Sequence, residues 1–147
     1  MKEEIHRMPA GIYYIGDLCY VLDHKTSGRD EWDEFCALTT KDHECLEGKF
    51  AFSDGREFVT FSTMYGDGEY PCSNGSRLGV DAGLIGCVAI NNILAPHTMS
   101  EMKYLGTIVT FKDEFLCYSE NGTLKFGNIS VNTAFEEEDE YLTEDES

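Results

Sequence analysis

Three short segments that combine glycine with aspartate constrain the fold of this chain most strongly. They are Gly16–Val21, Tyr65–Tyr70 and Val80–Gly86. In each segment strand-like sequence starts, stops or turns, because glycine adopts backbone angles that other residues avoid. A neighbouring aspartate can accept hydrogen bonds from the amides that such a turn leaves free. These segments are typical of the corners of a small β protein, and they are also suitable loops for a binding site.

The sequence between these segments is mostly typical of short strands. Runs at 49–53 and 57–62 flank Asp54-Gly55, a pair that favours a tight hairpin turn. Roughly eight to ten strands predict a mainly β (α+β) fold, a compact antiparallel sandwich or small barrel. The other predicted strands lie at 11–15, 78–82, 84–90, 107–111, 114–119, 123–126 and 128–131, and 18–22 is either a strand or irregular.

Two short helices are expected to pack on the sheets. Asp30 is a suitable N-cap for the first helix, which is predicted to end near Thr39. The sequence Thr98–Glu101 has the form of a capping box and begins the second helix, with Gly106 at its end. The apolar residues at helical spacing in the first helix predict its buried stripe: Trp32, Phe35 and Cys36.

The charge of the chain is strongly negative and uneven. At 147 residues and a net charge of −17, the chain is predicted to form a single β-rich domain over 1–135, followed by an acidic, disordered tail over 136–147. This charge disfavours binding to nucleic acid or to anionic membranes, so neither is expected as a partner. A basic protein partner would be attracted instead.

The cysteines and the N-terminus indicate a cytoplasmic protein. The six cysteines are widely spread without a Cys-x-x-Cys pair, and several lie in apolar stretches, which is typical of buried, reduced thiols. The first residues are polar and no signal-peptide core follows them. No apolar run approaches the ~20 residues that a membrane-spanning helix needs.

Tyrosines next to the glycine–aspartate segments are candidates for a binding site. A tyrosine beside a flexible glycine can stack on a base or another planar ligand, and Arg56 and Arg77 are near enough in sequence to neutralise a phosphate. Tyrosines in strands are also commonly half-buried sheet residues. The candidate binding residues are Tyr14, Asp17, Tyr20, Tyr65, Asp67, Glu69, Tyr70 and Asp81.

Catalysis is the alternative use of the same loops. Cys19 would need a histidine base within hydrogen-bond reach, and no histidine lies in a recognisable signature. Two loop carboxylates aimed at one cleft would support acid–base chemistry, but acids that cap their own turns have the same sequence appearance. Phosphate-binding glycine motifs are absent. The sequence assigns no catalytic residue, metal ligand or cofactor.

The order of the segments resembles a group of small uncharacterised proteins of bacteria and their viruses. The similarity lies in Gly-Asp-x-Cys-Tyr-Val, a Trp/Phe helix, Tyr-Gly-Asp-Gly-x-Tyr and Val-Asp-Ala-Gly-x-Ile-Gly, and it implies a phage or prophage setting. The leading hypothesis is a non-catalytic protein that inhibits a host defence protein through its acidic surface. The alternatives are a protein that sequesters a nucleotide-like ligand, and a small hydrolase that uses Cys19 or the loop carboxylates.

Overall fold

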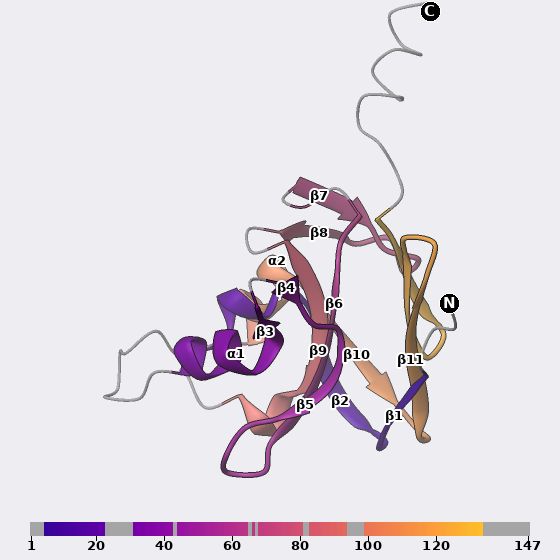
Figure 1. Cartoon of the computed structure of the whole chain (residues 1–147). Coiled ribbons are helices and arrows are strands. Elements are labelled where there is room, and N and C mark those ends of the chain that lie inside the picture. Colours follow the sequence, from indigo (N-terminus) through magenta and orange to yellow (C-terminus); the bar gives the residue numbers. More distant parts are fainter. Residues whose placement is uncertain are drawn as a thin grey trace, which may run out of the picture.

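The chain folds into a β sandwich with helices on one outer face. The computed structural model describes residues 5–22, 31–42, 44–64, 66, 68–80, 83–93 and 99–133. All strand pairs in these ranges are antiparallel, and the two main sheets do not close into a barrel. The predicted fold class is therefore confirmed, with the sandwich as the observed form. Figure 1 shows the layers in the order helices, five-stranded sheet and four-stranded sheet.

The five-stranded sheet is the middle layer. Its central strands contain continuous buried runs because both of its faces are covered, one by the other sheet and one by the helices. The strands lie in the spatial order β10 (Thr107–Phe111), β2 (Gly11–Gly16), β9 (Leu84–Ala89), β6 (Glu57–Ser62) and β5 (Gly48–Ala51).

In the described part of the chain, the four-stranded sheet is covered on one face only. Its longest strand alternates accordingly: Phe115 and Cys117 are buried against the other sheet, whereas Leu116 is exposed. The strands lie in the spatial order β1 (His6–Met8), β11 (Phe115–Glu120), β12 (Thr123–Phe126) and β13 (Ile129–Asn132).

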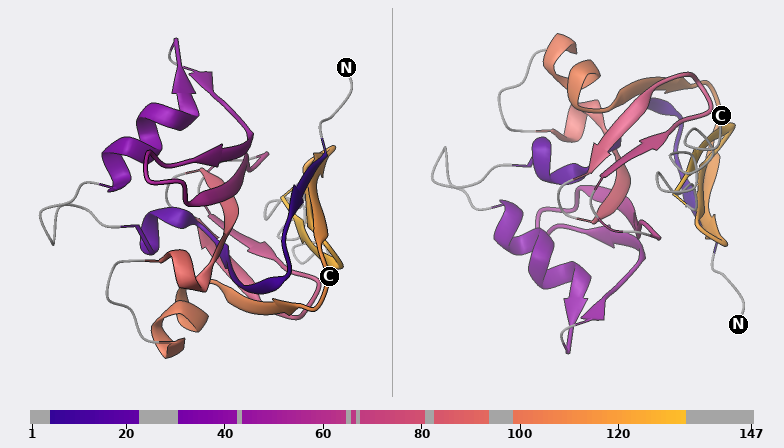
Figure 2. Two further views of the ribbon diagram at one scale, coloured as in Figure 1. Left: turned by 90° about the horizontal axis from the view of Figure 1, so that it is seen from below. Right: turned by 90° about the horizontal axis from the view of Figure 1, so that it is seen from above.

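The chain passes between the two sheets at one shared corner. It leaves the four-stranded sheet between β1 and β2, and it returns between β10 and β11. β1 pairs with β11, and β2 pairs with β10. The β1–β2 and β10–β11 connections therefore lie side by side at one edge of the sandwich (Figure 2). This geometry places the turn at 112–114 at the outer edge of the molecule.

Two hydrophobic cores lie on opposite faces of the five-stranded sheet. Neighbouring tyrosines in β2 go to different cores, since successive side chains of a strand point to opposite faces. Tyr13 lies in the core between the sheets, and Tyr14 lies in the core beneath the helices. The inter-sheet core also holds Cys87 and Cys117, and burial raises the pKa of the Cys87 thiol. The five cysteines whose side chains the structure describes, Cys19, Cys36, Cys72, Cys87 and Cys117, are free thiols, as the sequence predicts.

The helices agree with the sequence-based prediction. The first helix ends at Thr39, and Phe35 is buried in its stripe with Trp32 and Cys36 packed against the same core. The predicted caps Asp30 and Thr98 lie outside the described residues. Residues 18–22 do not form a strand: 18–20 are a 3-10 helix, and 21–22 continue as a turn. The helical elements are α1 (Glu31–Thr39), α2 (Met99–Leu105) and the short 3-10 helices η1 (Leu18–Tyr20) and η2 (Ile90–Asn92).

Two small ribbons complete the fold. Strands β3 (Thr40–Lys41) and β4 (Glu44–Cys45) follow α1, and β7 (Gly68–Pro71) pairs with β8 (Arg77–Val80) at the far end of the sandwich. The pattern of the sequence did not predict β1, β3, β4 or β7. The predicted acidic tail over 136–147 lies outside the described residues.

A nearly buried ion pair connects α1 to the sheet. The Arg56 Nη1 atom lies 2.7 Å from Glu31 Oε2, and the two side chains are 13% and 1% exposed. Arg56 also donates to Asp54 Oδ2 (2.8 Å) and to the Asn92 carbonyl (2.9 Å), and its guanidinium lies 4.7 Å from the centre of the Phe52 ring. Arg56 therefore links α1, η2 and the Asp54 turn through its Nε and Nη1 atoms.

Candidate functional site

The first and third glycine–aspartate segments meet at one place, which we call the η1 corner (residues 16–21 with Gly79 and Gly86). Gly16 of the first segment pairs with Gly86 of the third. A Cβ atom on Gly86 would lie 3.0 Å from Leu18 Cδ1, so η1 packs directly on this strand. The Tyr20 hydroxyl reaches to 3.9 Å from the position of a Cβ on Gly79 in β8, the strand that pairs with β7.

The polar groups of Tyr14 and Asp17 hold this corner together. Asp17 is fully buried, and its Oδ1 atom accepts a hydrogen bond of 2.9 Å from the Cys19 amide at the start of η1. The Tyr14 hydroxyl donates to the Asp17 carbonyl, also at 2.9 Å. Burial raises the pKa of Tyr14 well above its ordinary value, and the charge of Asp17 raises it further. Both residues are therefore inside the protein, where they stabilise the turn.

The other described candidates lie around β7. Tyr70 is buried in the inter-sheet core, and its hydroxyl donates to the Gly66 carbonyl at 2.8 Å. Tyr14 and Tyr70 thus lie on opposite sides of the five-stranded sheet. Glu69 is exposed and accepts from Arg77 Nε at 3.2 Å, on the strand pair that Tyr20 approaches. Tyr65, Asp67 and Asp81 lie outside the described residues.

The catalytic alternative needs a histidine next to Cys19, and the one histidine that the structure describes lies on a different element. Cys19 is partly exposed in η1, whereas His6 lies on β1, with its ring next to Gly48 and 6.3 Å from the Phe61 ring centre. His24, His43 and His97 lie outside the described residues, so the hydrolase hypothesis stays a prediction. No group of three or more His, Cys, Asp or Glu side chains in the described part of the chain is placed to hold a metal ion.

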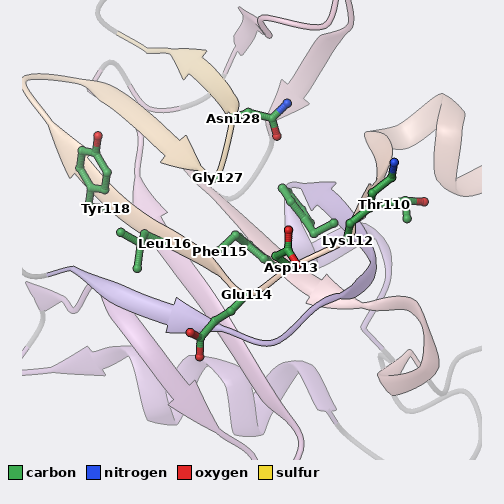
Figure 3. Close-up of a pocket in the computed structure, with 10 residues that line it drawn as sticks. Thr110, Lys112, Asp113, Glu114, Phe115, Leu116, Tyr118, Gly127 and Asn128 are labelled. Carbon is green, nitrogen blue, oxygen red and sulfur yellow. The ribbon is translucent and has the colours of Figure 1, made fainter.

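A pocket that the sequence did not predict lies at the shared corner of the sheets. We call it the β11 pocket; it has a volume of about 590 Å³ and lies between the β10–β11 turn at 112–114 and the β12–β13 turn at 127–128, beside Leu116 and Tyr118 (Figure 3). Phe111 and Phe115 stack at its base, with ring centres 3.7 Å apart. The only local sequence signal was a charged turn, Lys112-Asp113-Glu114, which is common on protein surfaces.

Glycine keeps the base of this pocket open. Gly127 has a φ of +64°, and a Cβ atom there would lie 2.7 Å from Phe111 Cε1. Its amide donates to the Leu116 carbonyl at 2.8 Å, which ties the β12–β13 turn to β11. The aromatic pair and the absence of a side chain at Gly127 together give the pocket an apolar base beneath a polar rim.

The polar side chains at the rim are available for a ligand. Within the described residues, the side chains of Asp113, Asn128 and Tyr118 have no hydrogen-bond or ion-pair partner. Glu114 accepts from Arg7 Nη1 at 3.1 Å, and both of these side chains are more than half exposed. An exposed pair of this kind contributes about 0–1 kcal/mol and exchanges readily with solvent or with another cation.

Comparisons with known proteins add no assignment. No protein-family model, no curated protein and no solved structure matches the chain. No helix in the described ranges is long and apolar enough to cross a membrane.

Proposed function

We propose that this chain is a non-catalytic binding protein of phage or prophage type, which inhibits a basic protein inside the host cell. A host defence protein that itself binds nucleic acid is the kind of target that fits. The acidic surface of the chain would then occupy the place of the phosphates. Electrostatic attraction of this kind raises the association rate and weakens as salt is added.

The observation that supports this proposal is a set of exposed carboxylates without a cationic partner. The chain carries 28 acids against 11 bases. Among the described residues, the exposed side chains of Glu44, Asp113 and Glu120 make no ion pair, whereas the buried Glu31 and Asp17 are committed to the fold. Charges that do not stabilise the fold and stay accessible are the ones that a partner can use.

Affinity capture from host lysate at about 50 and about 200 mM salt tests the proposal. We expect mass spectrometry to find a stoichiometric basic partner that is retained at the lower salt concentration and lost at the higher one. A variant that combines Glu44→Lys, Asp113→Lys and Glu120→Lys should lose this partner at both. Retention of the partner by the triple variant at both salt concentrations would remove the electrostatic mechanism.

A small planar or nucleotide-like ligand is the second candidate, and the position of Tyr20 favours it. This half-buried tyrosine lies beside Gly79, where the lack of a side chain leaves room next to Arg77 and Glu69. A ligand at one hundred times its dissociation constant adds about 2.7 kcal/mol to stability. A panel of nucleotides in a thermal-unfolding assay would reveal this stabilisation, and the absence of any shift across the panel would reject the candidate.

A further inference from the structure

We infer that the uncovered face of the four-stranded sheet binds an acidic segment of the chain's own sequence, residues 136–142. This inference goes beyond the proposed function, because it concerns a contact within the chain. Residues 134–147 lie outside the described ranges, so the described surface and the composition of the segment support it. The surface, which we call the β11 face, consists of outward side chains on β11 and its neighbours: Ile5, Arg7, Leu116, Tyr118 and Lys125.

The β11 face has an apolar strip that the described residues leave uncovered. Side chains alternate along β11, so Leu116 and Tyr118 point outward, whereas Phe115 and Cys117 point into the core. Leu116 is 38% exposed and Ile5 is 61% exposed, and the register of β1 with β11 brings Ile5 level with Tyr118. Large apolar side chains that gather on one exposed strip indicate a surface that another segment covers.

Two cations lie beside this strip. Lys125 on β12 and Arg7 on β1 are each opposite a residue of the strip in the strand register. Lys125 is partly buried and has no ion-pair or hydrogen-bond partner within the described residues. Arg7 makes an exposed pair with Glu114, and the acids Glu114 and Glu120 lie at the two ends of β11. On a chain with 28 acids and 11 bases, these cations make the middle of the β11 face complementary to an acidic segment.

The proposed segment has a matching composition. Five consecutive acids at 136–140 are followed by Tyr141 and Leu142. The carboxylates would accept hydrogen bonds from Lys125 and Arg7. Exposed ion pairs are weak on their own, so the contact also needs Tyr141 and Leu142 to cover the apolar strip and remove it from water.

The described part of the chain ends at a fixed point of the same sheet. Thr133 follows β13, and its amide donates to the Gly122 carbonyl at 2.8 Å. Ser130, three residues earlier, pairs with Lys125. A segment that turns back over the sheet at about 3.3 Å per residue would be level with Lys125 about three residues after Thr133, where the acidic run begins. The three strand spacings from β13 to β1 amount to about 14 Å, which residues 137–141 can span.

A charge-reversal pair in the full chain tests the inference by ¹⁵N relaxation. Lys125→Glu reverses a charge on the β11 face, and Lys103→Glu makes the same change on α2, in the helix layer away from this sheet (Figure 1). We expect order parameters above about 0.6 for the amides of 138–142 in the wild type and in Lys103→Glu, and values below about 0.6 in Lys125→Glu. Nuclear Overhauser effects between Leu142 and Leu116 should be present in the wild type.

A second variant changes the segment alone and leaves the described fold as it is. Tyr141→Ser combined with Leu142→Ser should lower the same order parameters and shift the amides of 116–118 and 125. Wild-type order parameters below about 0.6 at 138–142, or equal values in the two lysine variants, would overturn the inference. Order that is lost on dilution would assign the contact to the segment of a second copy, and this result would also overturn a contact within one chain.

Discussion

The η1 corner and the β11 pocket contain similar residue types and use them in opposite ways. Each has a glycine whose Cβ would clash, an aspartate and a tyrosine. At the η1 corner, Asp17 and Tyr14 are buried and bonded to the backbone. At the β11 pocket, Asp113 and Tyr118 reach solvent and have no partner among the described residues.

This difference follows from the layers that cover each place. The η1 corner is on the middle sheet, where the helix-side core covers the strands, so polar groups must find partners inside the protein. The β11 pocket is on the sheet that has one uncovered face, where water satisfies polar groups at little cost. Residue type alone therefore does not identify a binding site; the covering layer decides whether a polar group is free for a ligand.

Within the η1 corner, Gly86 should tolerate a side chain least and Gly79 should tolerate one well. A Cβ on Gly86 would lie 2.2 Å from the Val59 carbonyl of the paired strand, which cannot move without disturbing the sheet. We expect Gly86→Ala to lower the free energy of unfolding by about 3 kcal/mol or more, measured by urea denaturation. At Gly79 the nearest atom would be the Tyr20 hydroxyl at 3.9 Å, so Gly79→Ala should stay within about 0.5 kcal/mol.

Substitution of Gly127, the glycine of the β11 pocket, should lower the free energy of unfolding by an amount between those of Gly86→Ala and Gly79→Ala. Gly127→Ala combines a left-handed backbone with a contact to the edge of the Phe111 ring, a side chain that can shift. We expect a loss of about 1–2 kcal/mol, mainly from the backbone conformation. If Gly127→Ala cost as much as Gly86→Ala, the pocket would be part of the rigid core, and the contrast between the two places would be wrong.

The two aspartates provide the next comparison. Asp17→Ala removes the acceptor of the Cys19 amide at the start of η1, and we expect it to lower stability by about 1–2 kcal/mol. Asp17→Asn keeps an acceptor oxygen and should recover part of this loss. Asp113→Ala should change stability by less than about 0.5 kcal/mol, because nothing in the described structure depends on its carboxylate. Urea denaturation of the three variants would measure these values, and equal costs at Asp17 and Asp113 would contradict the assignment of roles.

The sequence predicts the elements of this fold where a local signal is strong. The Asp54-Gly55 and Asn121-Gly122 turns join the strands that the pattern predicted, and α1 ends at Thr39 as expected. β1 and β7 lack such a signal. His6–Met8 is short and contains one apolar residue, Met8, so it lacks a strand pattern and becomes a strand through its pairing with β11. β7 begins with glycine and ends with proline, so its strand conformation depends on the pairing with β8.

The site was harder to predict because the deciding contacts join distant parts of the chain. Tyr13 and Tyr14 are adjacent and identical, yet they enter different cores. Asp17 resembles an exposed loop acid, but η1 folds onto Gly86, about seventy residues later in the chain, and buries it. Asp113 resembles any acid of a surface turn. Its position across from Asn128 results from the pairing of three strands, which no local pattern encodes.

Alkaline pH should lower the stability of the fold through its buried tyrosines and not through the partly exposed Tyr118, and this effect is smaller than those above. Burial raises the pKa of Tyr14, and it raises the pKa of Tyr13 to about 12. The unfolded chain loses these protons near its ordinary pKa of about 10, so stability is complete below about pH 10 and falls as the pH rises through 10 towards the folded-state values. Each buried hydroxyl should therefore contribute about 1 kcal/mol to the loss of stability at about pH 11.

The Tyr14→Phe and Tyr118→Phe variants test whether the fall in stability at alkaline pH comes from the buried hydroxyl of Tyr14. Tyr14→Phe leaves the Asp17 carbonyl without its tyrosine donor and should cost about 1 kcal/mol at about pH 8. It should then lose less stability than the wild type between about pH 9 and about pH 11, because one buried titrating hydroxyl is gone. Tyr118→Phe should follow the wild-type curve, since its hydroxyl supports no described contact. A full alkaline loss in Tyr14→Phe would show that this hydroxyl is not held by the folded state, and the η1 corner would then resemble the pocket more than the core.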